Sequence, residues 1–459
     1  MSRNLDQLFH LTERGTDVKT EVIAGITTFM TMAYILAVNP NILSASGMDR
    51  GAIFTATCLA SLIATVLMAL LSNYPFVLSA GMGLNAYFAF TVVGQMGYSW
   101  QMALAAVFVE GVIFILLSLT NVREAIFNAI PTPLKHAVSA GIGLFIAFIG
   151  MQNSHLVVNN DSTLISVFSM KGSLAAGTFR TEGITVILTL IGVLITALLI
   201  VKKVKGNILI GILATWLLGI LCQLTGLYVP DNTAFFSLLP DFSAGIHVPS
   251  IAPTLMQMDF SRVFSPEFLV VIFAFLFVDL FDTLGTLIGV ASKADMLDKD
   301  GKLPRIRGAL LADAVGTTAG AALGTSTITT FVESASGVAE GGRTGLTGLV
   351  SAALFGLALC FSPIFLAIPS FATAPALIVV GFLMVSSILK VDFNDPAQAI
   401  PAFICMICMP FMYSISEGIA MGVISYVIIN MFSGAEKRRT ISPLMYVLAI
   451  LFVAKYFVL

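Results

Sequence analysis

Apolar segments long enough to cross a membrane recur along almost the whole chain. A transmembrane helix needs about 20 mostly apolar residues, so a chain with many such segments must place them in lipid or against one another. Of the 459 residues, 58% are hydrophobic and only 10% are charged, whereas a soluble domain usually carries about 25% charged residues. The pattern predicts an all-α polytopic membrane protein.

The apolar segments form two sets of seven, separated by a polar stretch at 229–262. The first set is 21–43, 51–72, 77–94, 100–120, 134–152, 183–201 and 206–228. The second set is 265–290, 306–322, 325–341, 344–366, 372–389, 396–413 and 416–432. One more apolar segment, 441–458, has two interpretations: a fifteenth span or a helix lying on the surface.

The positions of lysine and arginine predict how the spans are oriented. With the N-terminus in the cytoplasm, 18 of the 23 Lys and Arg residues fall in cytoplasmic segments, as the positive-inside rule requires. The polar first 20 residues lack the apolar core of a signal peptide. We therefore expect a multi-pass protein of the plasma (inner) membrane with a cytoplasmic N-terminus.

An odd number of spans in each half inverts the second half relative to the first, which is the arrangement of an inverted repeat. The sequence shows this repeat weakly. Residues 130–150 resemble 368–388 in a proline-led start and in their small residues, and 205–221 resemble 416–432. Because both pairs occur in the same order, we expect two inverted repeats of seven spans.

The third segment of each set is a poor continuous helix. Residues 77–94 read VLSAGMGLNAYFAFTVVG, and 325–342 read TSTITTFVESASGVAEGG. Hydroxyl and β-branched residues favour extended backbone, so each segment is predicted to be a short strand followed by a half-helix. Such paired interruptions indicate a transporter's binding site. The alternative is two tightly packed helices rich in small residues.

Several polar residues lie in or next to these segments. Asn85 and Glu333 follow the two breaks and are 248 positions apart, and the same offset relates Tyr34 to Asp282. An intramembrane acid costs roughly 2.5–3.5 kcal/mol on insertion scales and usually faces the bundle interior or a water-filled cavity. For Asp279, Asp313 and Glu110, a buried hydrogen-bonded acid remains the competing interpretation.

Other classes of function have little support in the sequence. The net charge is −2 and there is no long basic run, so nucleic-acid binding is not expected. The four histidines fall in loops or at span ends and form no ligand spacing with carboxylates. The CxxC spacing of Cys405 and Cys408 fits two small core residues of a helix. No metal and no cofactor are expected, apart from a proton as the coupling ion.

Five long segments carry a family resemblance. The chain resembles the purine permeases of the azaguanine/hypoxanthine (AzgA-like) group, within the nucleobase–cation symporter and nucleobase/ascorbate permease superfamily. The likeness covers essentially the whole chain. It rests on TTFMTMAYILAVNP, SAGMGLNAYFAFTVVG, FVDLFDTLGTLIGVASKADML, GTSTITTFVESASGVAEGGRTGLT and PAQAIPAFICMICMPFMYSISEGIAMGVISYVIIN.

The resemblance implies two kinds of domain, a core that carries substrate and a gate. The family's gate domain often mediates dimer contact, so a homodimer through the gate is an expectation. The implied division is 1–20 cytoplasmic segment; 21–120 core, spans 1–4; 121–228 gate, spans 5–7; 229–264 extracytoplasmic connection; 265–366 core, spans 8–11; 367–433 gate, spans 12–14; and 434–459 basic loop with a C-terminal apolar segment.

The resemblance also implies site residues. Asp282 in DTLG matches the acid of span 8, and Glu333 in VESASG matches that of span 10, whereas Asp279 has no counterpart. Thr286 stands where uracil-type relatives place a histidine, which makes uracil a less favoured substrate. The candidate substrate-binding residues are Asp282, Glu333, Asn85, Phe281, Thr286, Tyr34, Ala80 and Val332, with Glu333 and Asp282 as candidate proton carriers. Phe281 and Tyr34 are candidates for stacking on a base, and backbone N–H groups near 79–81 and 330–333 are candidate donors.

The implied function is uptake of purine nucleobases (hypoxanthine, guanine and adenine) by proton symport, with a core that moves against a gate. The protein would then be no enzyme. The alternatives are a permease of the same fold for xanthine or uracil, sodium coupling, and, less favoured, an intramembrane aspartyl protease that uses Asp282 and Asp313.

Overall fold

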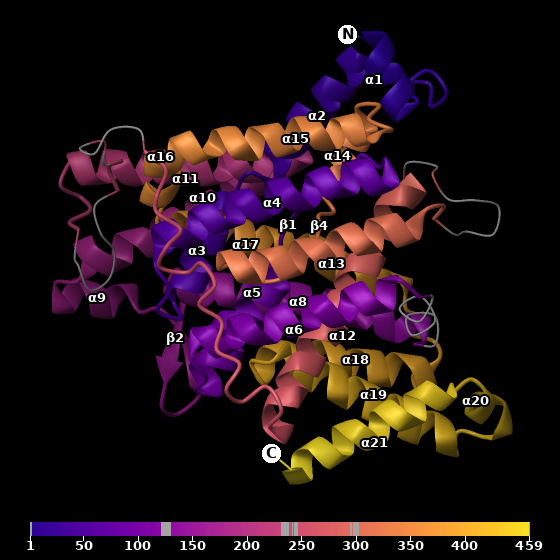
Figure 1. Cartoon of the computed structure of the whole chain (residues 1–459). Helices are drawn as coiled ribbons and strands as arrows, with labels where there is room; N and C mark the ends of the chain where they lie inside the picture. Colours follow the sequence, from indigo (N-terminus) through magenta and orange to yellow (C-terminus); the bar gives the residue numbers. More distant parts are fainter. Residues whose placement is uncertain are drawn as a thin grey trace.

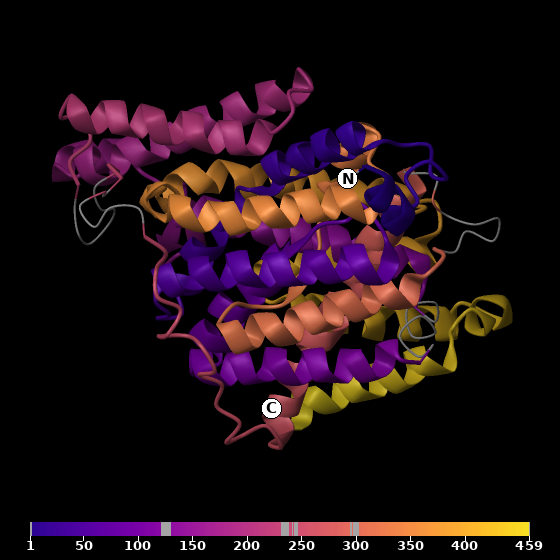
Figure 2. The same cartoon turned by 45° about the horizontal axis from the view of Figure 1, so that its top comes forward.

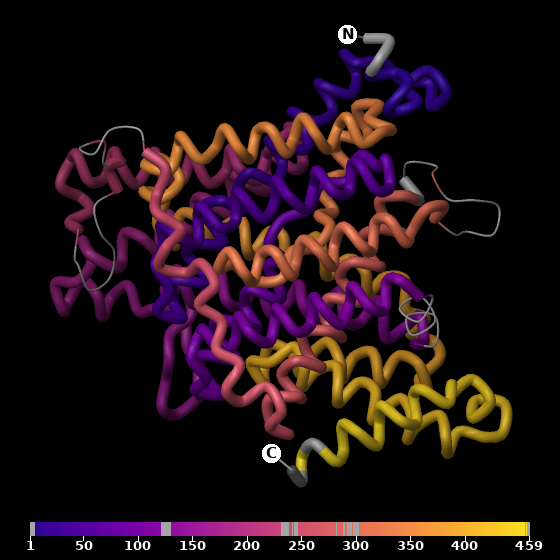
Figure 3. The backbone as a smooth tube through the Cα atoms, viewed as in Figure 1, coloured from indigo at the N-terminus to yellow at the C-terminus, as the bar shows by residue number. Residues whose placement is uncertain are grey.

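The computed structural model describes residues 2–120, 130–230, 238–240, 242, 247–293, 296 and 303–458. Within these residues, ten helical segments are long and apolar enough to cross a membrane. They form a single body of helices, with the two chain ends on opposite sides of it in the view of Figure 3.

In the first half, the predicted spans are helices except for the third. The first span passes from one helix to the next through a tight turn at Ala33 and Tyr34, both of which keep helical dihedral angles. Side chains begin several helices: the carboxylates of Asp17 and Asp49 accept hydrogen bonds from backbone N–H groups of the next turn at 2.9 and 2.7 Å, which is ordinary N-capping. The helices are α2 (Val18–Met32), α3 (Ile35–Ser44), α4 (Arg50–Ser72), α6 (Trp100–Ser118), α8 (Thr132–Asn153), α10 (Ile184–Val201) and α11 (Asn207–Leu224).

The second half repeats this order, and its first helix is continuous through both aspartates. The elements are α12 (Pro266–Lys293), α13 (Ile306–Leu323), α15 (Gly345–Ala358) followed by η3 (Leu359–Phe361) and α16 (Ser362–Ala367), α17 (Ser370–Val385) with η4 (Ser386–Lys390), α18 (Pro396–Phe411) and α19 (Ile415–Phe432).

The third and tenth spans are each a strand followed by a half-helix, as predicted. In the third, β1 (Leu78–Ala80) precedes α5 (Met82–Ala86) and the π-helix η1 (Tyr87–Gln95); in the tenth, β4 (Ile328–Thr330) precedes α14 (Ser334–Ala339). The strands pair antiparallel near the middle of the body (Figure 1). Ala80 lies opposite Ile328, the residue that the 248-residue offset relates to it, whereas the other two pairs of this antiparallel register depart from that offset.

The long helices form two packing groups on either side of this strand pair. One group comprises α2, α3, α4, α6, α12, α13, α14 and α15, and the other comprises α8, α10, α11, α17, α18 and α19. In Figure 2, α10 and α11 project from the second group at the upper left. Helices α8 and α17 cross where Gly143 meets Gly381, the pair that the likeness of 130–150 to 368–388 aligns.

Some elements were not predicted from the sequence. They are α1 (Ser2–Phe9), the hairpin of β2 (Val157–Asn160) and β3 (Leu164–Val167), α9 (Met170–Ala176), η2 (Phe179–Gly183) and α20 (Ala435–Arg439). The apolar C-terminal segment is α21 (Pro443–Val458), which packs against α19 and α12. At 16 residues, α21 is shorter than the roughly 20 residues of a full span.

Candidate functional site

The acid of span 10 is held by a tyrosine from the turn in span 1. Tyr34 separates α2 from α3, and its hydroxyl donates a 2.7 Å hydrogen bond to Oε1 of Glu333, the N-cap residue of α14. One turn away, the hydroxyls of Thr31 and Ser336 lie 2.9 Å apart. Two hydrogen bonds between residues about 300 positions apart therefore join the turn in span 1 to the interruption of span 10.

The acid of span 8 faces the break in span 3. Asp282 Oδ2 lies 3.5 Å from the position that a Cβ would take on Gly81, the N-cap residue of α5. Asp282 also lies within electrostatic range of Glu333. Spans 1, 3, 8 and 10 thus come together around two carboxyl groups.

Four of the predicted site residues are accessible. Asp282, Thr286 and Glu333 are partly exposed, and the Val332 side chain is 51% exposed. Gly285, between Asp282 and Thr286 on the same helical face, is also exposed, and among the described side chains none lies within 4 Å of the position that a Cβ would take. Both acids therefore keep some exposed surface on this side.

The other described site residues are fully buried. The Tyr34 ring is 0% exposed, so in this conformation it supports Glu333 and offers no open face for stacking. Asn85, on α5, accepts a hydrogen bond from Ser326 at Oδ1, whereas its Nδ2 has no acceptor among the described residues. A buried amide with an unmet donor is uncommon in native proteins. Ala80 lies in β1 and is also buried.

Two backbone N–H groups at the candidate site differ from expectation, and one candidate side chain lies outside the described structure. The backbone N–H groups of Gly81 and Phe331 were expected to be free for a ligand, but they donate to Thr327 O and Val77 O, both at 3.0 Å. These bonds extend the β1–β4 pairing. The sequence predicted the two strands but not the register in which they pair. The side chain of Phe281 is not among those that the structure describes.

The two aspartates of α12 occupy different surroundings. Asp279 is fully buried, and its Oδ1 lies 3.0 Å from the hydroxyl of Thr283, which also contacts Asp313 at 2.9 Å. Asp282 is on the accessible side. A spacing of three residues puts the two side chains roughly 60° apart on a helix. Here that angle is enough to place Asp279 in the interior and Asp282 on the partly exposed face.

Several hydroxyl groups that support the site were missed from the sequence. Ser326 and Thr327 belong to a hydroxyl-rich stretch that was interpreted only as strand-forming. For Thr31 and Ser336, the one signal in the sequence was a polar side chain in apolar surroundings. Glu340 pairs with Lys205 before α11, while Arg343 Nη1 donates to Val338 O and Gly342 O at 2.6 and 2.8 Å.

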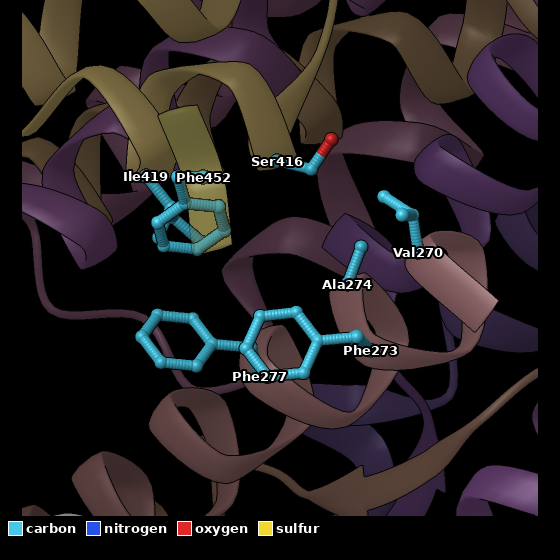
Figure 4. A pocket seen from close by; sticks show the side chains of 7 residues that line it. All are labelled: Val270, Phe273, Ala274, Phe277, Ser416, Ile419 and Phe452. Carbon is cyan, nitrogen blue, oxygen red and sulfur yellow. The ribbon is translucent and has the colours of Figure 1, made fainter. Parts of the chain in front are cut away.

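A small hollow elsewhere in the molecule is unsuited to a polar ligand. It lies between α12, α19 and α21 and has a volume of about 10 Å³, roughly the space of one water molecule. Figure 4 shows the rings of Phe273, Phe277 and Phe452 around it, with Ser416 as its one polar side chain. Over the described residues, no group of three or more His, Cys, Asp or Glu could hold a metal ion.

These features define a class of protein. Two sets of spans, each with a strand and half-helix in third place, meet at paired strands with accessible acids beside them. Non-helical backbone at membrane depth is tolerated where it is buried in protein or lines a cavity, and interrupted spans at a repeat interface are typical of secondary transporters.

The family follows from comparison with known proteins. The model of the Permease family (Xan_ur_permease) matches residues 19–451, and the chain belongs to this family. It is 45% identical to the guanine/hypoxanthine permease PbuG of Bacillus subtilis, over 98% of both chains. It is 40% identical to the adenine permease AdeP of Escherichia coli, over 98% of this chain and 95% of that one. The predicted family likeness is confirmed, and these relatives are transporters rather than enzymes.

Solved structures confirm the fold. The transmembrane domain of the cyanobacterial bicarbonate transporter BicA superposes with a TM-score of 0.62 at 16% identity, covering 88% of this chain and 97% of that chain. The anion transporter SLC26A9 gives 0.60 at 13% identity, covering 90% and 65%. The prediction of two inverted repeats of seven spans is therefore confirmed.

Proposed function

We propose that this protein imports purine nucleobases, namely hypoxanthine, guanine and adenine, by proton symport. The observation that carries the proposal is the convergence of Glu333 and Asp282, both accessible, at the breaks of spans 10 and 3. The identity of 40–45% to guanine/hypoxanthine and adenine permeases over nearly the whole chain supports this choice of substrate.

A flat base with ring N–H groups fits two acceptors. A carboxylate accepts parallel donors in one plane, so Glu333, oriented by Tyr34, would bind one edge of the base. Asp282 would bind a second donor across the site, with Thr286 and Val332 beside it. The Nδ2 group of Asn85 is a donor that a base carbonyl or ring nitrogen would satisfy. No lysine or arginine of the sequence lies next to these residues, which suits a neutral ligand.

The same acids would carry the proton. A carboxyl group in a water-poor site near a second acid binds a proton more readily, because burial and a like charge both disfavour the ionised form. Proton and base would enter together from outside and leave together inside. Glu333 and Asp282 are the two candidate carriers, and Glu333 has the tyrosine donor that steadies its ionised form.

Alternating access would come from movement between the two packing groups. The group that contains α2, α4, α12, α13 and the half-helices would be the core, and the group that contains α8, α17, α18 and α19 would be the gate. The core would carry the acids past the gate in an elevator-like movement. We further propose that the N-terminus is cytoplasmic in the plasma membrane and that a homodimer forms through the gate.

Uptake of labelled bases tests the proposal directly. Cells that lack their own permeases and express this chain should accumulate hypoxanthine, guanine and adenine above vector controls, and a protonophore should abolish the accumulation. Xanthine and uracil are expected to stay near background. Background uptake of all three purines would contradict the substrate assignment, and sodium dependence with protonophore resistance would contradict proton coupling.

The two aspartates of α12 should respond differently to substitution. Asp282→Asn removes an accessible acceptor and is expected to abolish uptake, because a hydrogen bond to a charged group is worth about 1.5–3 kcal/mol. Asp279→Asn changes a fully buried group and should leave the affinity for the base within about threefold of wild type. Calorimetric titration of the purified variants with hypoxanthine measures the affinity of each, and the uptake assay measures the loss of transport in Asp282→Asn. Equal losses of affinity would show that the aspartates share one role.

A further inference from the structure

A second group of acids lies in the interior, among three packed helices. Glu110 on α6, Asp279 on α12 and Asp313 on α13 are each 0% exposed. Helix α6 packs against both α12 and α13. Gly111, next to Glu110, permits the close approach of α13, because a Cβ there would lie 2.9 Å from the backbone nitrogen of Thr318. Spans from both halves thus contribute carboxyl groups to one buried cluster.

The carboxyl groups of Glu110 and Asp279 face each other within hydrogen-bond reach. Thr327 donates to Glu110 Oε2 at 3.2 Å, while Glu110 Oε1 has no donor among the described residues. Two ionised carboxylates offer only acceptors, whereas a protonated carboxyl offers a donor. The contact becomes a hydrogen bond when the pair holds one proton.

The hydroxyl of Thr283 points to the same conclusion. Its oxygen lies 3.0 Å from Asp279 Oδ1, 2.9 Å from Asp313 Oδ1 and 3.0 Å from the hydroxyl of Thr329. One hydroxyl carries one hydrogen, so it can donate to only one of the two carboxyls. The other carboxyl can form a hydrogen bond with this hydroxyl only when it is protonated, because it then donates to the hydroxyl oxygen.

The surrounding helices supply no basic side chain at this depth. Helix α6 contains no lysine, arginine or histidine; Arg307 is the second residue of α13, and Lys293 is the last of α12. The groups that face Glu110 are Asp279, Asp313 and the hydroxyl of Thr327. A proton can therefore supply the positive charge that the cluster needs.

We infer that Glu110 and Asp279 form a proton-binding site, with one proton held between the two carboxyls, separate from Glu333 and Asp282. While the proton is bound, it joins α6 to α12 across the two halves of the chain. Its release leaves two facing carboxylates that repel each other, so protonation is linked to the packing of these two helices. The inference concerns the protein without substrate and does not require that the substrate be a purine.

Infrared spectroscopy of the purified full-length protein, with no base present, tests the site. A protonated carboxyl has a C=O stretching band that shifts in D₂O and disappears when the group ionises. At neutral pH the wild-type protein should show this band. Glu110→Gln and Asp279→Asn should each remove the component that the pair contributes, whereas Glu333→Gln, the matched control among the accessible acids, should retain it.

Two results would overturn the inference. One is a band of unchanged intensity in Glu110→Gln. The other is loss of the wild-type band on adding sodium at constant pH, which would make the cluster a cation site. Should the variants of the pair fail to fold, the double variant Glu333→Gln/Asp282→Asn must still show the band, and its absence would refute the site. The uptake assay tests the proposed function separately, since it detects base transport and the spectrum does not.

Discussion

Glu333→Gln is expected to reduce purine uptake to background while the amount of protein in the membrane stays normal. The substitution keeps the size of the side chain but replaces a carboxylate by an amide, which removes the charge and one acceptor. Losing a hydrogen bond to a charged group costs about 1.5–3 kcal/mol, and here both the bond from Tyr34 and the bond to the base are affected. Initial uptake rates should therefore fall at least about 100-fold. Labelled hypoxanthine uptake, normalised to protein measured by immunoblot, gives the result.

Tyr34→Phe is the matched control for this prediction. It removes the hydroxyl that donates to Glu333 at 2.7 Å and leaves the carboxylate in place. One lost hydrogen bond should weaken uptake about tenfold, clearly less than the loss in Glu333→Gln. Wild-type uptake in Glu333→Gln would refute the role of the carboxylate. An equally severe loss in both variants would mean that the tyrosine acts on the base itself.

The interruptions of spans 3 and 10 could be predicted because local chemistry causes them. The hydroxyl and β-branched residues of TSTITT favour extended backbone, and the glycines after Ser79 permit close approach: a Cβ on Gly81 would lie 2.7 Å from Thr329 Cγ2. The two stretches also match in position across the repeat. The sequence therefore predicted both strands and their matching places in the two repeats, whereas their pairing with each other is known from the structure.

The turn at Ala33 and Tyr34 in span 1 was not predicted, because both residues keep helical dihedral angles and no local pattern marks them. Nothing in the residues around Ala33 and Tyr34 disfavours a helix, and Pro40 lies inside α3 without ending it. Tyr34 at this turn donates to Glu333, 299 positions away. The 248-residue offset related Tyr34 to Asp282 by position in the repeat, and it did not indicate the pairing with Glu333.

The surroundings of the buried acids were equally beyond prediction. A spacing of three residues placed Asp279 and Asp282 on one broad face of a helix, but only the packing of α6 and α13 decides which carboxyl is enclosed. Glu110 was a plausible structural acid in the sequence, since a single acid in an apolar segment gives no sign of its partner. Its contact with Asp279 joins residues 169 positions apart, and no local pattern encodes such a distance.

Gly381→Val should prevent accumulation of folded protein, because the crossing of α8 and α17 leaves no room for a side chain. A Cβ on Gly381 would lie 2.7 Å from Ala147 Cβ and closer still to Gly143 O, and one on Gly143 would lie 2.6 Å from Gly381 O. Backbone atoms cannot rotate away, so the cost should reach the upper end of the overpacking range, about 3 kcal/mol or more. Small residues at such crossings let transmembrane backbones approach closely. The yield of monodisperse protein in detergent and its thermal midpoint measure the effect.

Gly285→Ala is the matched control for the crossing, since it adds a methyl group to a glycine inside another span. No atom of the described side chains lies within 4 Å of the position that its Cβ would take, and alanine is favoured over glycine in a helix by about 1 kcal/mol. The yield and thermal midpoint of this variant should equal or exceed those of wild type. If the yield and thermal midpoint of Gly381→Val match those of Gly285→Ala, then α8 and α17 do not approach each other at Gly143 and Gly381 as closely as the structure indicates. A loss confined to Gly381→Val would instead identify this contact between equivalent residues of the two repeats as a requirement for folding.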